Sequence, residues 1–287
     1  MSKPTEGGFN WRHAPEFGFF TTLMVLFLYA PLAVLVVYSF NANRLVTIWG
    51  GFSLRWFAKV VQNGDIQAAA VTSLIVAAAA TLCSVTIAVA AALALARGRL
   101  FVGRGAATGL IMMPLVVPEI VVATTTLIFF STLGMTIGLL NLIIAHTVFC
   151  IPFAMLPIQA RLQAMGATNE DAARDLYGSE WRIFRRITLP LLMPGIVAGG
   201  ILAFVSSLDD FLISFMVSGA GNTTLPVYVY GMMRMGVTPE VNAISTILLV
   251  ISTLLAFCVF IFSRPTAVSG APAAKRPSLS LSTQEIT

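Results

Sequence analysis

Long apolar runs, separated by short polar stretches, dominate this chain of 287 residues. Six of the runs carry few or no charged residues and are long enough to cross about 30 Å of hydrocarbon, which takes about 20 helical residues. Because backbone groups in lipid must be hydrogen-bonded within the segment, each run is predicted to be a helix. The fold class expected is therefore all-α, a polytopic membrane bundle of six transmembrane helices. The predicted spans are residues 17–40, 66–96, 106–133, 139–160, 191–214 and 243–263.

The composition supports a membrane protein. Hydrophobic residues make up 57% of the chain and charged residues only 10%, whereas soluble domains carry about 25% charged residues. The three cysteines, Cys83, Cys150 and Cys258, fall inside predicted spans. We expect them to be small core residues, because nothing near them has the spacing of a disulfide framework or a metal site.

The basic residues predict the orientation in the membrane. Six spans place both termini on one side, and 13 of the 17 Lys and Arg residues fall on that side. Such an asymmetry predicts that both termini and the loop at residues 161–190 are cytoplasmic. The net charge of +5 therefore reports topology, and nucleic-acid binding is not expected. The four basic residues on the other side are Arg44, Arg55, Lys59 and Arg234.

The same pattern predicts the domain organisation. Residues 1–16 form a polar cytoplasmic segment, and residues 17–264 form the membrane domain. The tail at residues 265–287 is rich in Ser, Ala, Pro and Thr, a composition typical of disordered cytoplasmic segments.

Glycine and proline add detail to the spans. The pairs Gly105–Gly109 and Gly195–Gly199 have the GxxxG spacing that lets helices approach closely, although such glycines can also simply be tolerated. Pro114 and Pro118 remove backbone donors and are predicted to kink the third span.

The polar loop before the fifth span predicts two short helices. Thr168 and Asp171 have the spacing of a capping box. Gly178 is expected to end the first helix, and Ser179 to cap a second, amphipathic helix that Pro190 closes. By these signals alone, the loop either packs on its own bundle or projects as a lever that another protein grips. The apolar residues of the second helix share one face: Trp181, Phe184 and Ile187.

The loop resembles the EAA loop of ATP-binding-cassette importer permeases. The resemblance rests on Asp171-Ala172-Ala173, a following glycine, and Ile187-x-Leu189-Pro190. It covers roughly residues 15–265 and implies the fold of a type I importer permease. It also implies a non-catalytic subunit that forms half of a polyamine pathway. Further strings resemble the spermidine/putrescine branch of this superfamily: residues 113–119, 207–211, 221–226 and 236–243.

The resemblance implies that the first loop helix fits a groove in a cytoplasmic ATPase. Two departures stand out: Asp171 replaces the usual Glu, and Tyr177 occupies the position of the usual loop glycine, with Gly178 one residue later. We therefore expect a turn that is shifted by one residue. The residues assigned to ATPase coupling are Glu170, Asp171, Ala172, Ala173, Arg174, Asp175, Leu176, Tyr177 and Gly178.

The partners follow from the same resemblance. The sequence contains no G-x-x-x-x-G-K-[ST] phosphate loop, so ATP and Mg²⁺ are expected to bind a separate ATPase dimer. The resemblance implies a second, related permease subunit and a periplasmic or extracellular solute-binding protein. It places the chain in the bacterial inner (plasma) membrane, with no cofactor or metal of its own.

Ionisable residues within the spans are candidates for the substrate pathway. At about 1.5 Å per residue, Glu119, Asp209 and Asp210 lie at similar depths, roughly 20–30 Å from the cytoplasmic edge. Three carboxylates at one level would attract a di- or trivalent amine. Alternatively, the two aspartates mark the watery outer end of the fifth span. His146 is expected to be packed and hydrogen-bonded.

Other functions are compatible with these features. An ABC permease of this type could carry another amine, an opine or a metal chelate. In a secondary transporter driven by an ion gradient, the intramembrane carboxylates would instead carry protons or sodium. A membrane scaffold without transport would tolerate changes at Arg174 or Gly178 that break the loop.

Overall fold

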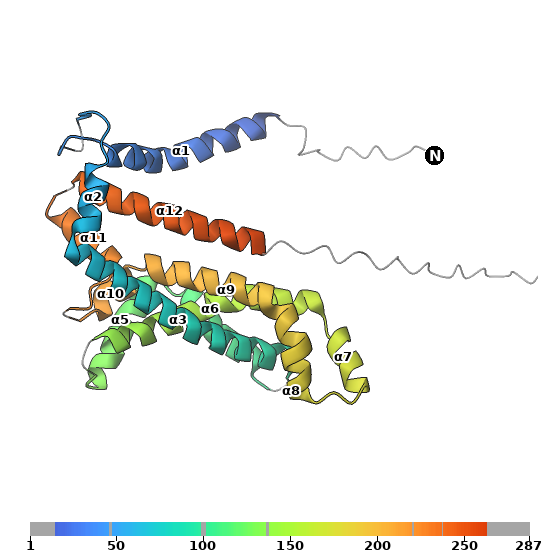
Figure 1. Cartoon of the computed structure of the whole chain (residues 1–287). Helices are drawn as coiled ribbons and strands as arrows, with labels where there is room; N and C mark the ends of the chain where they lie inside the picture. The colour runs from blue at the N-terminus through green and yellow to red at the C-terminus, as the bar shows by residue number, and fades with distance from the viewer. Residues whose placement is uncertain are drawn as a thin grey trace, which may run out of the picture.

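A computed structural model describes residues 15–45, 48–98, 102–135, 138–219, 221–236 and 238–262. Within these ranges the regular structure is helical, apart from an isolated β-bridge between Asn41 and Phe52 (Figure 1). The predicted tail at 265–287, and all but the last two residues of the predicted segment 1–16, lie outside the described residues. The helices are α1 (Pro15–Ser39), α2 (Arg55–Gln62), α3 (Gly64–Arg97), α4 (Arg104–Val116), α5 (Glu119–Thr132), α6 (Leu139–Met165), α7 (Thr168–Asp175), α8 (Glu180–Ile183), α9 (Leu189–Asp209), α10 (Leu212–Val217), α11 (Leu225–Arg234) and α12 (Pro239–Phe262), with a π-helical turn η2 (Phe184–Thr188) between α8 and α9.

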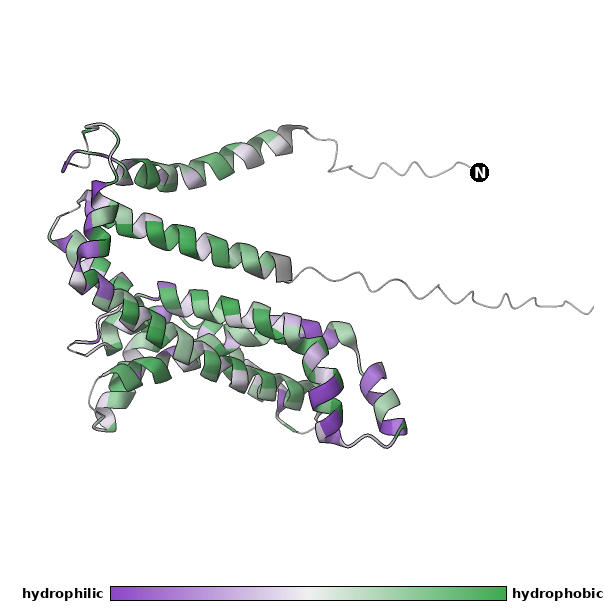
Figure 2. Ribbon diagram, viewed as in Figure 1, coloured by the Kyte–Doolittle hydropathy of each residue, from purple (hydrophilic) through white to green (hydrophobic). Residues whose placement is uncertain are grey.

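The described helices confirm a membrane bundle. Five are long and apolar enough to cross a membrane, and six spans result if α4 and α5 are counted together. The apolar residues run along these helices, while polar residues gather at α7 and α8 and again near α2 (Figure 2).

The third predicted span is not one straight helix. Helices α4 and α5 meet at an angle of 107°. Val117, between them, has extended backbone angles of −75° and 135°, as expected for a residue that precedes a proline. Pro118 also lacks the N–H that would continue the helical hydrogen bonds. The predicted kink is therefore a complete break, and it brings Glu119 to the start of a new helix.

The fifth predicted span also differs from its expected bounds. Its helix is continuous from Glu180 to Asp209, so Pro190 does not close the preceding helix. Instead, Leu189 donates its N–H to the carbonyl of Phe184 in the wider π turn, which accommodates a proline that cannot donate. At the other end the helix stops at Asp209, and the chain restarts as α10.

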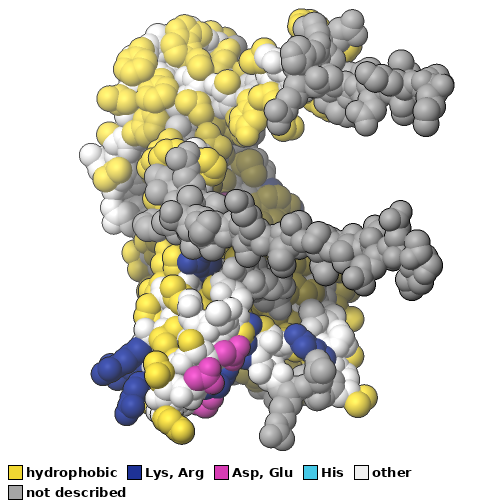
Figure 3. Space-filling view, turned by 90° about the vertical axis from the view of Figure 1, so that its right-hand side faces the viewer, with side chains coloured by type: hydrophobic (Ala, Val, Ile, Leu, Met, Phe, Trp, Pro, Cys, Tyr) yellow, Lys and Arg dark blue, Asp and Glu magenta, His cyan; other side chains and the backbone are white. Residues whose placement is uncertain are grey.

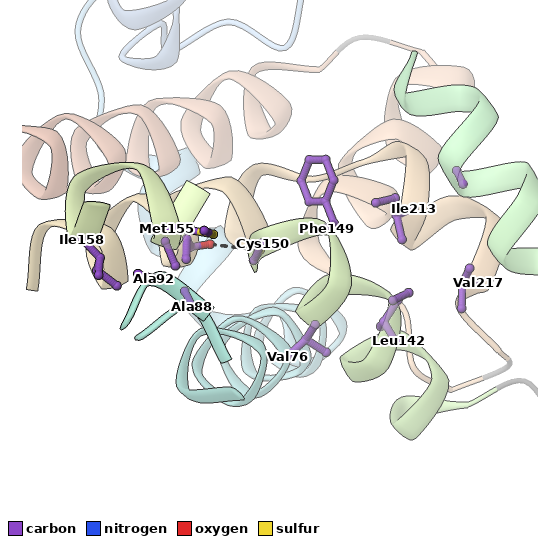
Figure 4. Close-up of a cluster of buried hydrophobic side chains, with 14 of the residues drawn as sticks. Val76, Ala88, Ala92, Leu142, Phe149, Cys150, Met155, Ile158, Ile213 and Val217 are labelled. Carbon is purple, nitrogen blue, oxygen red and sulfur yellow. Dashed lines mark hydrogen bonds between the residues drawn. The ribbon is translucent and has the colours of Figure 1, made fainter. Parts of the chain in front are cut away.

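The core of the bundle lies between α3, α6 and α9. Its buried side chains follow one face of α6 and meet α3 and α10 (Figure 4). Small residues permit the close contact, because a Cβ on Gly199 would lie 2.4 Å from the carbonyl oxygen of Ala154. A Cβ on Gly195 would lie 2.7 Å from Cβ of Arg161. This glycine pair is therefore a packing motif, as its spacing predicts.

The other expectations about small residues are met only in part. A Cβ on Gly105 or Gly109 would find nothing within 4 Å, so this pair makes no close helix contact within the described residues. Cys150 is buried, as expected for a core residue, whereas Cys83 is exposed and Cys258 only half-buried. The exposure of Cys83 follows from its position on a face of α3 that the described bundle leaves uncovered.

A second apolar cluster closes the end of the bundle opposite α7 and α8. It joins α2, the first turns of α3, α11 and the beginning of α12. The indole N–H of Trp56, in α2, donates to the carbonyl of Asn41 at 2.7 Å. Ser73 of α3 accepts a hydrogen bond from the backbone N–H of Leu225 at 2.8 Å. The long helix α3 therefore connects this cluster with the opposite end of the bundle.

Candidate functional site

Two breaks in the membrane helices bring two carboxyl groups together. Glu119 is the first residue of α5, and Asp210 lies between α9 and α10. Helices α5 and α10 pack against each other, and they bring the carboxyl group of Glu119 close to that of Asp210. The two groups, which the sequence analysis places at similar depths, are therefore neighbours in the fold.

The partners of Asp210 hold it within the bundle. Its side chain is fully buried and accepts the backbone N–H groups of Ser214 at 2.8 Å and Ile213 at 3.4 Å. Nε2 of His146 lies 3.4 Å from its Oδ2. A buried carboxylate is stable only with such partners, because it has lost its hydration. Asp210 is thus a fixed group, whereas the partly exposed Glu119 is the accessible end of the pair.

His146 completes this network from α6. Its Nδ1 is hydrogen-bonded to Oγ of Ser207 at 2.8 Å, and its Nε2 to Oγ of Ser214 at 3.0 Å. The ring is fully buried, which confirms the expectation of a packed, hydrogen-bonded histidine.

Asp209 is not part of the same cluster. It is exposed, and its two carboxylate oxygens accept hydrogen bonds from Oγ of Ser252, in α12, at 3.3 and 3.2 Å. At the end of a helix, the side chains of adjacent residues point in different directions, so Asp209 and Asp210 face different neighbours. The expected set of three carboxylates is therefore a pair plus one separate group. The alternative, in which both aspartates are solvent-exposed at the outer end of the fifth span, fits Asp209 but not Asp210.

The first helix of the polar loop at residues 161–190 starts differently from the prediction. Ala167 is the N-cap residue of α7, and no side chain caps the helix. The expected capping box at Thr168 and Asp171 is therefore wrong. The Asp171 carboxylate is instead paired with Arg174 at 2.8 Å, three residues further along the same helix, where side chains are neighbours.

The turn after α7 is not shifted by one residue, contrary to expectation. Tyr177 itself adopts the left-handed backbone conformation, with φ of 59°. Its N–H bonds to the carbonyl of Arg174, and the N–H of Gly178 to that of Ala173, at 2.9 and 3.0 Å. This is the Schellman pattern with a tyrosine at the position usually taken by glycine. A non-glycine residue there costs about 1–2 kcal/mol.

Gly178 is required for space. A Cβ at this position would lie 2.8 Å from the carbonyl oxygen of Ala173 and 3.3 Å from the side chain of Ile183. Ser179 is the N-cap residue of α8, as predicted, but its side chain makes no capping hydrogen bond.

Arg174 connects the two short helices across this turn. Its guanidinium contacts Asp171 within α7 and donates to both carboxylate oxygens of Glu180, in α8, at 2.8 and 3.2 Å. Individual surface ion pairs contribute little, about 0–1 kcal/mol. A two-pronged contact of this kind nevertheless favours one orientation of α7 relative to α8.

The outer surface of the loop combines charge with exposed apolar side chains. Leu176, Tyr177 and Trp181 are 83%, 97% and 69% exposed. Charged side chains gather on the same end of the molecule (Figure 3). Large apolar groups left in water on a polar segment mark a contact surface. The remaining predicted coupling residues on this surface are Asp171, Ala172, Ala173, Arg174 and Asp175, all exposed or half-buried.

Glu170 is placed differently from the rest of the predicted coupling residues. It is 2% exposed, and its carboxylate contacts Arg97 at the end of α3 and Thr188 in η2. Sequence reasoning did not single out Arg97 or Thr188 for this loop. The available signal was that Arg97 directly follows the predicted span 66–96, on the same predicted cytoplasmic side as the acidic loop.

The described residues contain no group of three or more His, Cys, Asp or Glu side chains that could hold a metal ion. The candidate site therefore consists of a carboxyl pair at two helix breaks and a charged loop at one end of the bundle.

The chain is similar to permeases of known transport systems. The chain is 39% identical over 229 residues to the putrescine transport system permease protein PotI of Escherichia coli (strain K12), covering 78% of this chain and 82% of PotI. It is 37% identical over 238 residues to the spermidine/putrescine transport system permease protein PotC of the same organism, covering 83% of this chain and 90% of PotC.

Solved structures show the same fold. A bacterial ABC transporter involved in the import of the acidic polysaccharide alginate contains a chain that aligns with a TM-score of 0.64 at 16% identity, over 86% of this chain and 93% of that one. A chain of the MetNI methionine ABC transporter aligns with a TM-score of 0.57 at 18% identity, over 74% of this chain and 98% of that one. Residues 84–264 match the family described as binding-protein-dependent transport system inner membrane component. The chain therefore belongs to this family of multi-pass inner-membrane permeases.

Proposed function

We propose that this chain forms half of the pathway of an ATP-driven importer for polyamines. The observation that carries the proposal is the carboxyl pair Glu119–Asp210, set where two membrane helices are broken. Carboxylates within a membrane domain are costly unless they have a task, and a pair of them attracts a multivalent organic cation. The names of PotI and PotC, which specify putrescine and spermidine, support this substrate class.

Each carboxylate has its own part in the proposed pathway. Glu119 is the accessible group that contacts an ammonium of the substrate. Asp210, which accepts a hydrogen bond from the backbone N–H of Ser214 at 2.8 Å, lies behind it in the wall. Asp209, with its exposed carboxylate beside α12, has a secondary place at the edge of the pathway.

The proposed energy source is a separate cytoplasmic ATPase dimer that binds ATP and Mg²⁺. The exposed apolar surface of Leu176, Tyr177 and Trp181, with the charges around it, is suited to a groove in such a partner. The chain itself is a non-catalytic subunit. Both of its termini and the EAA loop face the cytoplasm, in agreement with the distribution of Lys and Arg.

Two further partners belong to the proposal. A second, related permease subunit completes the pathway, and a solute-binding protein delivers the substrate from the opposite side. One of the similar structures, an alginate ABC transporter, was solved in complex with a substrate-bound periplasmic protein.

The test is stimulation of ATP hydrolysis by a panel of amines. The chain would be purified with its copurifying ATPase and sister subunit, reconstituted in lipid and mixed with the solute-binding protein. We expect putrescine or spermidine to stimulate hydrolysis, and monoamines or amino acids to have little effect. Stimulation by an opine or a metal chelate instead would assign a different substrate to the same machinery.

A further inference from the structure

Glu170 differs from every other acidic residue of the EAA loop in its burial. Its side chain is 3% exposed, compared with 62% for Asp171 and 73% for Glu180. Burying a carboxylate without partners is strongly unfavourable, so its position must be compensated by contacts within this chain. A residue so enclosed has no surface to offer to a second protein.

The two carboxylate oxygens of Glu170 contact two different elements. Oε2 accepts from Nε of Arg97, the last residue of α3, at 2.9 Å. Oε1 accepts from Oγ1 of Thr188, in the π turn that leads into α9, at 3.0 Å. Charge-assisted hydrogen bonds of this kind are among the strongest side-chain contacts.

Arg97 extends the connection to a third span. Its guanidinium also donates to the carbonyl of Leu162, at 3.5 Å, and to that of Gly166, at the end of α6. Four elements therefore meet at one ion pair: the loop helix α7 and the ends of α3, α6 and the α9 helix.

Open space lies beside this ion pair. A cleft of about 320 Å³ separates the end of α3 from α8, and Arg97, Glu170, Arg174 and Trp181 are among the residues that line it. Within α7, only Glu170 is buried. A push on the exposed side of α7 can therefore reach the ends of α3 and α9 through Glu170, and it reaches α8 through the contact of Arg174 with Glu180.

We propose that the Glu170–Arg97 ion pair, with Thr188, is the joint that transmits displacement of the EAA loop to α3 and α9. This inference rests on the proposed function. Glu170 is a positioning residue: it holds α7 against the span ends, while its exposed neighbours contact the ATPase. Helix α3 has 34 residues, a length of about 50 Å at 1.5 Å per residue. Displacement of its Arg97 end therefore reaches Ser73, which lies 24 residues or about 36 Å along the helix and contacts Leu225.

The test compares Glu170→Gln, Arg97→Gln and the double variant with wild type in the lipid-reconstituted transporter. The matched control is Asp65→Asn, the same carboxylate-to-amide change at an exposed position in the first turn of α3. We expect the ratio of substrate imported to ATP hydrolysed to fall about tenfold in Glu170→Gln, a size typical of coupling between sites. The amount of ATPase copurified should stay at the wild-type level. The coupling ratio of the double variant should be no lower than that of either single variant, because all three variants break the same contact.

Hydrogen exchange provides a second readout that needs no substrate. In the assembled transporter, amide exchange over residues 168–176 should become faster in Glu170→Gln and Arg97→Gln and stay unchanged in Asp65→Asn. The joint is disproved if exchange and coupling ratio in Glu170→Gln both match the control. It is also disproved if Glu170→Gln releases the ATPase, which would make Glu170 a docking contact. If exchange responds as expected but wild type imports no polyamine, the proposed function fails and the joint remains.

Discussion

Nε2 of His146 lies 3.4 Å from Oδ2 of Asp210, and both side chains are fully buried between α6 and α10. This contact connects two helices at the point where one membrane span is broken. It also fixes the carboxylate against which Glu119 is placed. The geometry of the proposed cation site therefore depends on a residue that does not line it.

Replacing His146 by alanine is expected to destabilise the bundle. The change leaves a cavity and unpairs the buried hydroxyl groups of Ser207 and Ser214, which together cost about 3–5 kcal/mol. Thermal unfolding of the purified protein in detergent measures the effect. Val148→Ala, at a 53% exposed position on the same helix, is the control and should shift the midpoint little. Equal midpoints for the two variants would contradict the proposed role of His146.

Glu119→Gln is expected to impair substrate import more than Asp209→Asn. Glu119 pairs with Asp210 at the helix break, whereas Asp209 is already hydrogen-bonded to Ser252 at the edge of α12. Losing a charged contact to an ammonium group costs about 1.5–3 kcal/mol, or roughly tenfold or more in the KM for uptake. Concentration-dependent uptake of labelled spermidine measures both variants. Unchanged KM in Glu119→Gln would remove this residue from the pathway.

Gly199→Ala is expected to destabilise the contact between α6 and α9. The added Cβ would lie 2.4 Å from the carbonyl oxygen of Ala154, a backbone atom that cannot move away without displacing α6. Forcing extra volume into a packed contact costs about 1–3 kcal/mol. Gly109→Ala is a matched control, since its Cβ would meet nothing within 4 Å. Midpoints of thermal unfolding should therefore separate the two variants, and equal values would show that the contact is looser than described.

Tyr177→Gly is expected to stabilise the loop and weaken its docking. Glycine adopts the left-handed conformation observed at Tyr177 without strain, which favours the turn by about 1 kcal/mol. The tyrosine ring is 97% exposed, so its loss removes apolar area from the proposed ATPase contact. Amide exchange over residues 173–179 should slow, while less ATPase copurifies. Faster exchange in Tyr177→Gly would show that the ring itself holds the turn.

Much of the fold could be predicted from the sequence because lipid leaves few choices. A long apolar run must be a helix, and the six predicted runs all contain helices. The predicted helix bounds are wrong where proline and polar residues interrupt an apolar run. A proline can lie within a helix, as Pro114 does in α4, or separate two helices, as Pro118 does. The number of apolar residues in a run does not distinguish these two cases.

The candidate site was predictable as a set of residue types but not as a geometry. The sequence places Glu119 and Asp210 at one depth, yet it treats Asp209 and Asp210 as equivalent. Their separation depends on the direction in which each side chain leaves a helix end. Similarly, Glu170 and Asp171 are both acidic residues of a first helical turn. Only tertiary packing buries one and exposes the other.

ATP-dependent uptake of labelled spermidine and putrescine into proteoliposomes tests the central claim most directly. The vesicles would contain the chain with its copurified ATPase and sister subunit, with the solute-binding protein and substrate on one side and ATP on the other. The account predicts uptake that requires ATP, requires the binding protein and continues when ion gradients are dissipated. Uptake that persists without ATP and stops when the gradients collapse would contradict it.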